Sequence, residues 1–242
     1  MLLNRIICGA LLLFLLLGCK KHSTEYAVPE VGPVVITGYS ETQSLTDFSQ
    51  FVKERAAAII AKYNPGFDKQ VKVVLYSSAR ALHEAQGQPD APDWLVGQAR
   101  SNGEIWMVYP YNSTLHSYED MKKILLHEYT HIVIYSVNPF IPSWLNEGIA
   151  GYEADQHKTQ GEIATLKAEA ASKRLPNYLT IDDDLSTGIV YKYARSVVEY
   201  VQSTYALDGL KKLIQDPNVV EVFQISQSDF QEGWRTFIME KY

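Results

Sequence analysis

HEYTH at residues 127–131, followed by WLNEGIA at residues 144–150, is the stretch around which this chain is organised. Positions i and i+4 of a helix point the same way, so the imidazoles of His127 and His131 can bind one metal ion from one side. Glu128 lies about 100° further round the helix, beside the metal and not on it. There its carboxylate can take a proton from a metal-bound water and deliver it to a leaving amine, which is the chemistry of amide hydrolysis.

The residues around the first motif predict a helix from Tyr118 to Val137. Ser117 and Asp120 have the spacing of a capping box, and Asn138 before Pro139 is a stop signal. Apolar residues at helical spacing share the stripes of the two histidines and of the intervening glutamate. Bare polar groups on such a face would be costly to desolvate, and a bound cation relieves that cost.

A zinc hydrolase site needs a third protein ligand and one open position. Pro139 and Pro142 force a turn after the first helix, and Ser143 can cap a second helix. Glu147 then lies one turn into that helix and can face the histidines. His157 is the alternative third ligand.

Together the two motifs resemble those of the gluzincin metallopeptidases, which carry H-E-x-x-H followed by a helix with W-L-x-E-G-[LIF]-A. The resemblance implies that His127, His131 and Glu147 bind one Zn²⁺ ion and that Glu128 is the general base. It also implies an α+β, zincin-like fold with a small mixed sheet and helices in the N-terminal lobe, an active-site helix, and a mainly helical C-terminal lobe. The substrate would be a peptide or a protein.

A tyrosine is a further candidate for the site. The helix predicted over residues 190–205 resembles the tyrosine-bearing helix that follows the zinc ligands in many gluzincins. Tyr193 is the better match for a phenol that donates to the developing oxyanion, and Tyr191 is the alternative. A tyrosine that only packs in the core is the competing interpretation.

One position departs from the family. Some gluzincins have an acidic residue one turn after the glutamate ligand that orients a zinc-bound histidine, and this chain has Gly151 there. The orienting partner must then come from elsewhere, and the candidates are Glu153, Asp155 or a backbone carbonyl.

The N-terminus predicts export and a lipid anchor. Residues 1–18 have a short basic segment and an apolar run, which is typical of a signal peptide. Leu16, Leu17, Gly18 and Cys19 resemble a bacterial lipobox, in which the signal is cut before the cysteine and that cysteine is acylated. An ordinary secretory signal or an uncleaved anchor is the alternative. We expect a tether over residues 19–37 and a metallopeptidase domain over residues 38–242.

Composition narrows the function classes. The two cysteines are Cys8 and Cys19, and Cys8 would leave with the signal, so an internal disulfide and cysteine catalysis are excluded. The net charge is −6 and the longest basic runs, such as Lys20 and Lys21, have only two residues, which argues against nucleic acid as a partner. The expected partners are a peptide or protein substrate and a membrane of the bacterial cell envelope, with the outer membrane or cell surface favoured over the inner membrane.

Periodicity predicts further elements in both halves of the chain. Residues 104–109 should form a strand near the active-site helix, either at the cleft edge, where gluzincins bind extended substrate, or in the core. The other predicted elements are a short edge strand at 34–36, a strand at 71–76, and helices at 45–63, 79–86, 162–174 and 229–242.

Two other functions compete with the peptidase. A lipoprotein could keep the zincin fold, and even the zinc, as a catalytically silent binding or assembly module, but such a module has no need of Glu128 as a base. A non-haem iron site of two histidines and a carboxylate fits less well, because it needs neither the glutamate directly after the first histidine nor a helical i, i+4 pair.

Overall fold

The computed structural model describes residues 34–41, 44–181 and 189–242. The predicted signal peptide, Cys19 and most of the predicted tether lie outside the described residues. The fold is α+β, as predicted, with one small mixed sheet and a majority of helix. Within the described ranges, no helix is both long enough and apolar enough to cross a membrane.

The sheet has four strands in the order β1-β2-β4-β3. The first three of these neighbours run parallel, and β3 pairs antiparallel with β4 at one edge. The strands are β1 (Val34–Gly38), β2 (Val71–Tyr76), β3 (Gly97–Ala99) and β4 (Glu104–Val108). β1 pairs along its length with β2 and includes the short edge strand predicted at residues 34–36.

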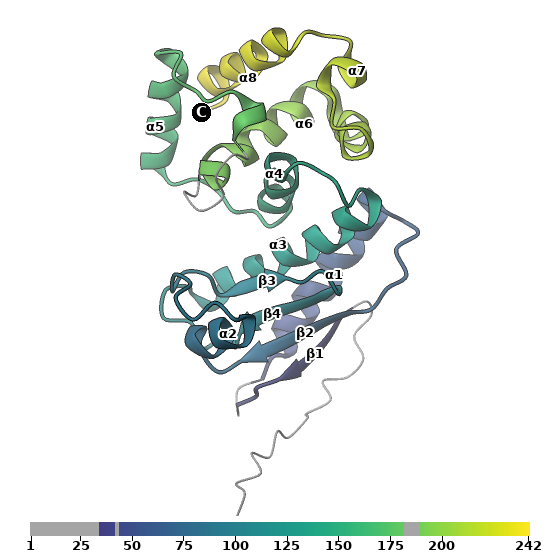
Figure 1. Cartoon of the computed structure of the whole chain (residues 1–242), viewed down its shortest axis with the longest axis vertical. Coiled ribbons are helices and arrows are strands. Elements are labelled where there is room, and N and C mark those ends of the chain that lie inside the picture. The colour runs from purple at the N-terminus through teal and green to yellow at the C-terminus, as the bar shows by residue number, and fades with distance from the viewer. Residues whose placement is uncertain (1–33, 42–43, 182–188) are drawn as a thin grey trace, which may run out of the picture.

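Helices cover both faces of this sheet (Figure 1). The helices α1 (Thr46–Tyr63) and α3 (Tyr118–Val137) pack together on one face, and α2 (Ala79–Gln86) packs on the other. In β2 the side chains alternate between buried and more exposed, which is the period of two expected of a strand with one deeply buried face. α3 packs against β3 and β4, so the sheet fixes the position of this helix.

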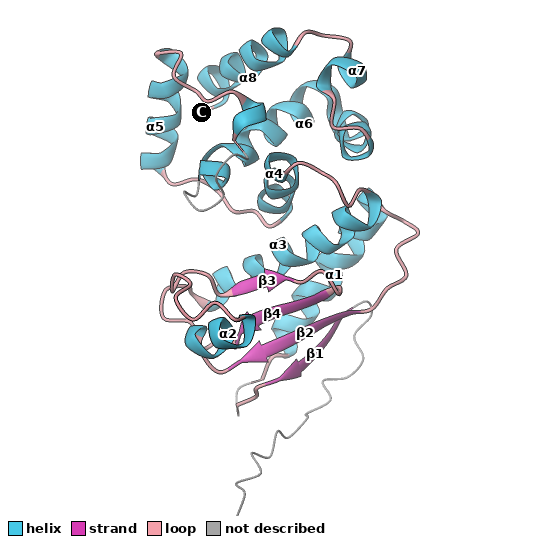
Figure 2. Cartoon of the chain, viewed as in Figure 1, coloured by secondary structure: helices cyan, strands magenta, loops and turns pink. Residues whose placement is uncertain are grey.

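The C-terminal lobe contains helices and no strand among the described residues (Figure 2). Its central pair is α4 and α6, which pack closely at Gly148, where an added Cβ would lie 2.6 Å from the carbonyl oxygen of Ala194. The helices of this lobe are α4 (Ser143–Glu153), α5 (Gln160–Ala171), α6 (Ile189–Gln215), α7 (Val219–Phe223) and α8 (Gln227–Lys241), with a 3₁₀ turn at Tyr178–Thr180.

The predicted elements near the site form. The helix predicted over residues 118–137 has these bounds, and the capping box between Ser117 and Asp120 is present. The strand predicted over residues 104–109 is β4, and it lies inside the sheet, which is the core alternative. The edge strand on the side of α3 is β3, which is three residues long and was not among the predicted strands. Its Gly97 and Gln98 carry little apolar signal, which is why periodicity missed it.

Candidate metal centre

Three side chains from two consecutive helices converge on one point. His127 and His131 come from α3, and Glu147 comes from α4, one turn after its start. Glu147 Oε2 lies 3.1 Å from His127 Nε2 and 3.5 Å from His131 Nε2. One ligand atom from each residue lies within 4.8 Å of the others, so this cluster could hold a metal ion.

Two of the three separations within the cluster suit a tetrahedral ion. Ligands about 2.05 Å from a tetrahedral centre lie about 3.3 Å from one another. The two measured separations from Glu147, 3.1 and 3.5 Å, bracket that value. The imidazole rings of His127 and His131 are nearly perpendicular, with centroids 4.6 Å apart, so both can aim Nε2 at one ion without stacking.

Local sequence explains how Glu147 reaches the histidines. Pro142 is the N-cap of α4, so that helix begins one residue after the second proline of the connecting turn. The predicted cap, Ser143, is instead the first residue of the helix. Leu145 and Ile149 are fully buried, and they turn the opposite face of α4 into the core, which leaves Glu147 facing α3.

The cluster is electrostatically coupled. Burial opposes a charge on His131, yet the adjacent Glu147 carboxylate outweighs it and raises the pKa of His131 to about 9. Burial also opposes the charge on Glu147, but the two imidazoles hold the pKa of Glu147 well below its usual range. Glu147 therefore stays ionised, as a carboxylate ligand must be.

Glu128 lies beside the cluster and is held by the edge strand. The backbone N–H of Ala99 in β3 donates to Glu128 Oε2 at 2.7 Å. The cleft in front of this carboxylate is also lined by His127, so Glu128 and the metal-binding cluster open onto one cavity. One oxygen of Glu128 is fixed by the sheet, which leaves the other available for proton transfer.

The orienting partner of His127 is Gln156, which the sequence reasoning missed. His127 Nδ1–H donates to Gln156 Oε1 at 2.9 Å, which fixes the ring with Nε2 toward Glu147. A Cβ at Gly151 would lie 3.5 Å from the same Gln156 oxygen. The glutamine amide therefore occupies the space into which an acidic side chain at position 151 would project.

The predicted alternatives for this role have other partners. Glu153 Oε1 accepts hydrogen bonds from Lys62 and Tyr63, both at 2.6 Å. Asp155 pairs with Arg55 at 3.2 Å. These contacts hold the end of α4 against α1 and do not reach the histidines.

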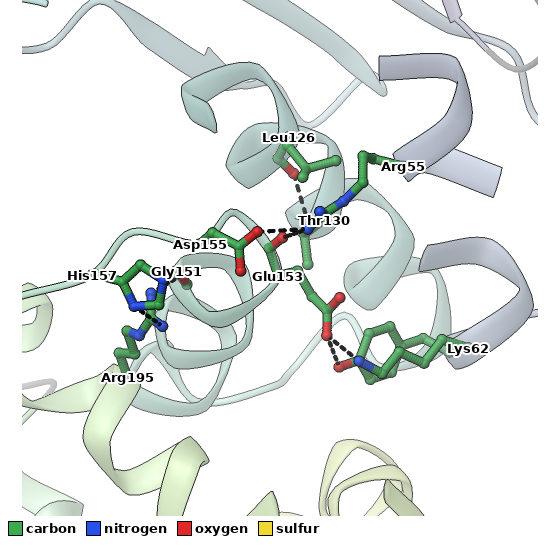
Figure 3. A network of polar contacts seen from close by, with 10 residues as sticks. Arg55, Lys62, Leu126, Thr130, Gly151, Glu153, Asp155, His157 and Arg195 are labelled. Carbon is green, nitrogen blue, oxygen red and sulfur yellow. Dashed lines mark hydrogen bonds and ion pairs between the residues drawn. The ribbon is translucent and has the colours of Figure 1, made fainter. Parts of the chain in front are cut away.

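The segment that carries Gln156 is tied to both lobes (Figure 3). On one side, Arg55 of α1 donates to the Glu153 carbonyl at 2.6 Å as well as to Asp155. On the other side, Arg195 of α6 donates to His157 Nδ1 and to the Gly151 carbonyl, each at 3.0 Å. His157 therefore contacts an arginine and does not belong to the metal-binding cluster.

The structure brings Tyr191, not Tyr193, to the site. The Tyr193 hydroxyl donates to Glu169 Oε2 at 2.8 Å, and its ring packs edge-on against Trp234 inside the C-terminal lobe. Tyr191 lines the cavities that contain His127, and burial followed by the charges of Glu147 and Glu128 raises its pKa. Residues i and i+2 of a helix point in directions about 200° apart. Only one of the two tyrosines can therefore face the histidines.

Some residues at the site could have been predicted from the sequence, and others could not. Tyr135 follows His131 by four residues, and burial, followed by the charges of Glu147 and Glu128, raises its pKa, so the i, i+4 rule could have placed it near the cluster. Gln156 and Ala99 reach the site through loop and sheet geometry that no periodicity encodes. Comparisons with known proteins add no assignment, since no protein-family model and no curated protein matches the chain.

Proposed function

We propose that this protein is a zinc-dependent metallopeptidase of the gluzincin type, with a zincin-like fold, that hydrolyses peptide bonds in peptides or proteins. The observation that carries the proposal is the convergence of His127, His131 and Glu147 on one point with Glu128 beside them. A bound Zn²⁺ would lower the pKa of water toward about 7 and polarise the substrate carbonyl.

The protein's own residues supply the remaining steps. Glu128, anchored by the Ala99 N–H, takes the proton of the attacking water and passes it to the leaving amine. Gln156 holds His127 in the tautomer that presents Nε2 to the ion. A purely structural zinc site would not need the carboxylate of Glu128.

Tyr191 is the proposed donor to the developing oxyanion. Burial and the nearby carboxylates of Glu147 and Glu128 raise its pKa, so the phenol keeps its proton at neutral pH. A neutral hydroxyl at the cavity wall can donate a hydrogen bond to an oxygen that gains negative charge during the attack.

We further propose that the enzyme acts in the bacterial cell envelope, held on a membrane by lipid on Cys19. The support is the L-x-G-C sequence at the end of the apolar N-terminal run. Acyl chains on this cysteine would place the catalytic lobes at the membrane surface.

The test uses the full chain in detergent, with metal analysis and a peptide-library cleavage assay on wild type, Glu128→Gln and His127→Ala. We expect one zinc per chain and cleavage for wild type, zinc without cleavage for Glu128→Gln, and loss of both for His127→Ala. Glu119→Gln, at an exposed position on the same helix, is the matched control and should cleave like wild type.

Two results would change the proposed function or the role of Glu128. A wild-type protein that binds zinc and cleaves no peptide would favour the silent binding or assembly module. Cleavage that survives in Glu128→Gln would remove that residue from its proposed role as the base.

A further inference from the structure

The cavity beside Glu128 is mainly apolar. Its volume is about 500 Å³, enough to hold a large side chain together with part of a peptide backbone. Of its lining residues only Glu128 carries a full charge when the histidines are neutral. The apolar part of the wall consists of Trp94, Leu95, Val96, Ile124 and Tyr191.

Two exposed aromatic rings line this cavity and contact each other. The rings of Trp94 and Tyr191 meet edge to face with centroids 6.4 Å apart. The exposed fractions are 51% for Trp94 and 48% for Tyr191, although both rings lie in a concave surface. Trp94 belongs to the loop before β3 and Tyr191 to α6, so the pair joins the two lobes.

The loop that carries Trp94 is held in place. The Trp94 carbonyl oxygen lies 3.1 Å from His116 Nε2, and the Leu95 carbonyl oxygen lies 2.8 Å from Nε2 of His83, which is buried. The backbone N–H of Leu95 also donates to the Pro92 carbonyl at 2.9 Å. The fixed backbone and the contact with the Tyr191 ring together restrict the indole ring before any ligand arrives, which lowers the entropic cost of binding.

The floor of the cavity is kept close to the catalytic carboxylate by a glycine. A Cβ at Gly97 would lie 2.8 Å from a methyl group of Ile124 and 3.5 Å from Cγ of Glu128. Any side chain at this position would push β3 away from α3 and enlarge the gap beside Glu128. One side chain of a substrate can therefore contact the apolar wall while its backbone lies beside Glu128.

We propose that Trp94 and Tyr191 form an aromatic pair in the cavity wall against which a large apolar side chain of the substrate binds, on a residue adjoining the scissile bond. The inference rests on the proposed peptidase function and adds the substrate class. Aromatic rings bind apolar groups over a large area at small conformational cost, and the pair offers two faces at nearly right angles, 73°. An acidic side chain would be repelled by Glu128, and a basic one would lose water against the apolar wall.

The experiment measures selectivity and binding separately, with the full chain in detergent. Matched fluorogenic peptides carry Phe, Leu, Ala or Asp at one varied position beside the cleaved bond. The enzymes are wild type, Trp94→Ala, Trp94→Phe and Phe140→Ala, the last at an aromatic residue that is 89% exposed and outside this cavity. Calorimetry on the Glu128→Gln protein, with and without Trp94→Ala, measures binding of the same peptides without turnover.

We expect wild type to prefer Phe or Leu over Ala by at least about tenfold in kcat/KM, and Trp94→Ala to lose most of this preference. Trp94→Phe should retain part of it, and Phe140→Ala should retain all of it. Binding of the Phe peptide to the Glu128→Gln protein should weaken by a similar factor when Trp94 is replaced.

The two hypotheses fail in different ways. Apolar peptides that bind through Trp94 but are never cleaved by wild type would overturn the peptidase proposal and support the binding role of the aromatic pair. Equal binding with and without Trp94→Ala, no binding at all, or cleavage with no preference for Phe or Leu would overturn that binding role.

Discussion

Replacing Gln156 with methionine removes one hydrogen-bond acceptor from the metal centre and little else. Methionine has nearly the same length and volume, so the space next to Gly151 stays filled. His127 Nδ1–H, which now donates to Gln156 Oε1 at 2.9 Å, would lose its partner. The imidazole could then rotate or change tautomer, and Nε2 would no longer be held toward Glu147.

The size of the effect follows from burial. The His127 side chain is only 9% exposed, so water cannot easily replace the lost acceptor. Leaving a buried donor unsatisfied costs about 1–3 kcal/mol, and lost outer partners weaken metal binding by about 10- to 100-fold. We therefore expect the Kd for zinc to rise about 10- to 100-fold, while the fold survives because Gln156 lies in a loop.

Competition against a chromogenic zinc chelator measures this Kd, and the visible spectrum of the cobalt-loaded protein reports the ligand geometry. Gln156→Glu keeps an acceptor oxygen and should retain wild-type affinity or exceed it. Gln160→Met, at an exposed glutamine in α5, controls for the methionine itself. Wild-type zinc affinity and an unchanged cobalt spectrum in Gln156→Met would refute the orienting role.

Four further predictions concern stability. Gly148→Ala should lower the free energy of unfolding by about 1–3 kcal/mol in urea, because the added Cβ would lie 2.6 Å from both the Ala194 carbonyl and a Val198 methyl; Gly161→Ala, with nothing within 4 Å, is the control, and equal losses would contradict the packing argument. Tyr63→Phe should cost about 1–2 kcal/mol in the same assay, because the buried hydroxyl donates to Glu153, and an unchanged midpoint would speak against this contact. The Ser117 hydroxyl holds the pKa of Asp120 below its usual range, so this carboxylate stabilises the fold above about pH 4 and the contribution is lost as the pH falls through the lowered folded-state pKa. Asp120→Asn should therefore be less stable than wild type at pH 6 and equally stable near pH 2, and the opposite order would be inconsistent with the cap. Chelation should lower the Tm of the zinc-loaded protein, since a ligand at about 1,000 times its Kd adds about 4 kcal/mol, and a shift of the same size in His127→Ala would show that the metal binds elsewhere.

The parts of the fold that the sequence predicts best are those governed by local chemistry. The bounds of α3 follow from a capping box at one end and an Asn-Pro step at the other, and the structure has both ends at the predicted residues. The three candidate ligands were predicted from helical spacing and from one short turn, and the structure brings them together. In each case the deciding residues are within about 20 positions of one another in the chain.

The parts that sequence reasoning missed depend on contacts between distant segments. Ala99 reaches Glu128 through the pairing of a three-residue edge strand, and its side chain carries no signal for that role. Gln156 was passed over because an acidic residue was expected to orient a histidine. The choice between Tyr191 and Tyr193 depended on the rotation of α6 about its axis, which is set by packing against α4 and α8. Motif spacing does not specify that rotation.

The geometry of Gln156 makes the candidate metal centre depend on both lobes. Asp155 has a backbone φ of 52°, a left-handed conformation that costs a non-glycine residue roughly 1–2 kcal/mol, and this turn directs the next side chain back toward His127. Arg55 from α1 and Arg195 from α6 hold the two flanks of the turn. A shift of one lobe against the other would move these flanks apart, so the lobe arrangement and the orientation of a metal ligand are linked through one short loop. Because Arg55 is partly exposed and Arg195 is buried, high salt should loosen the first flank and leave the second intact.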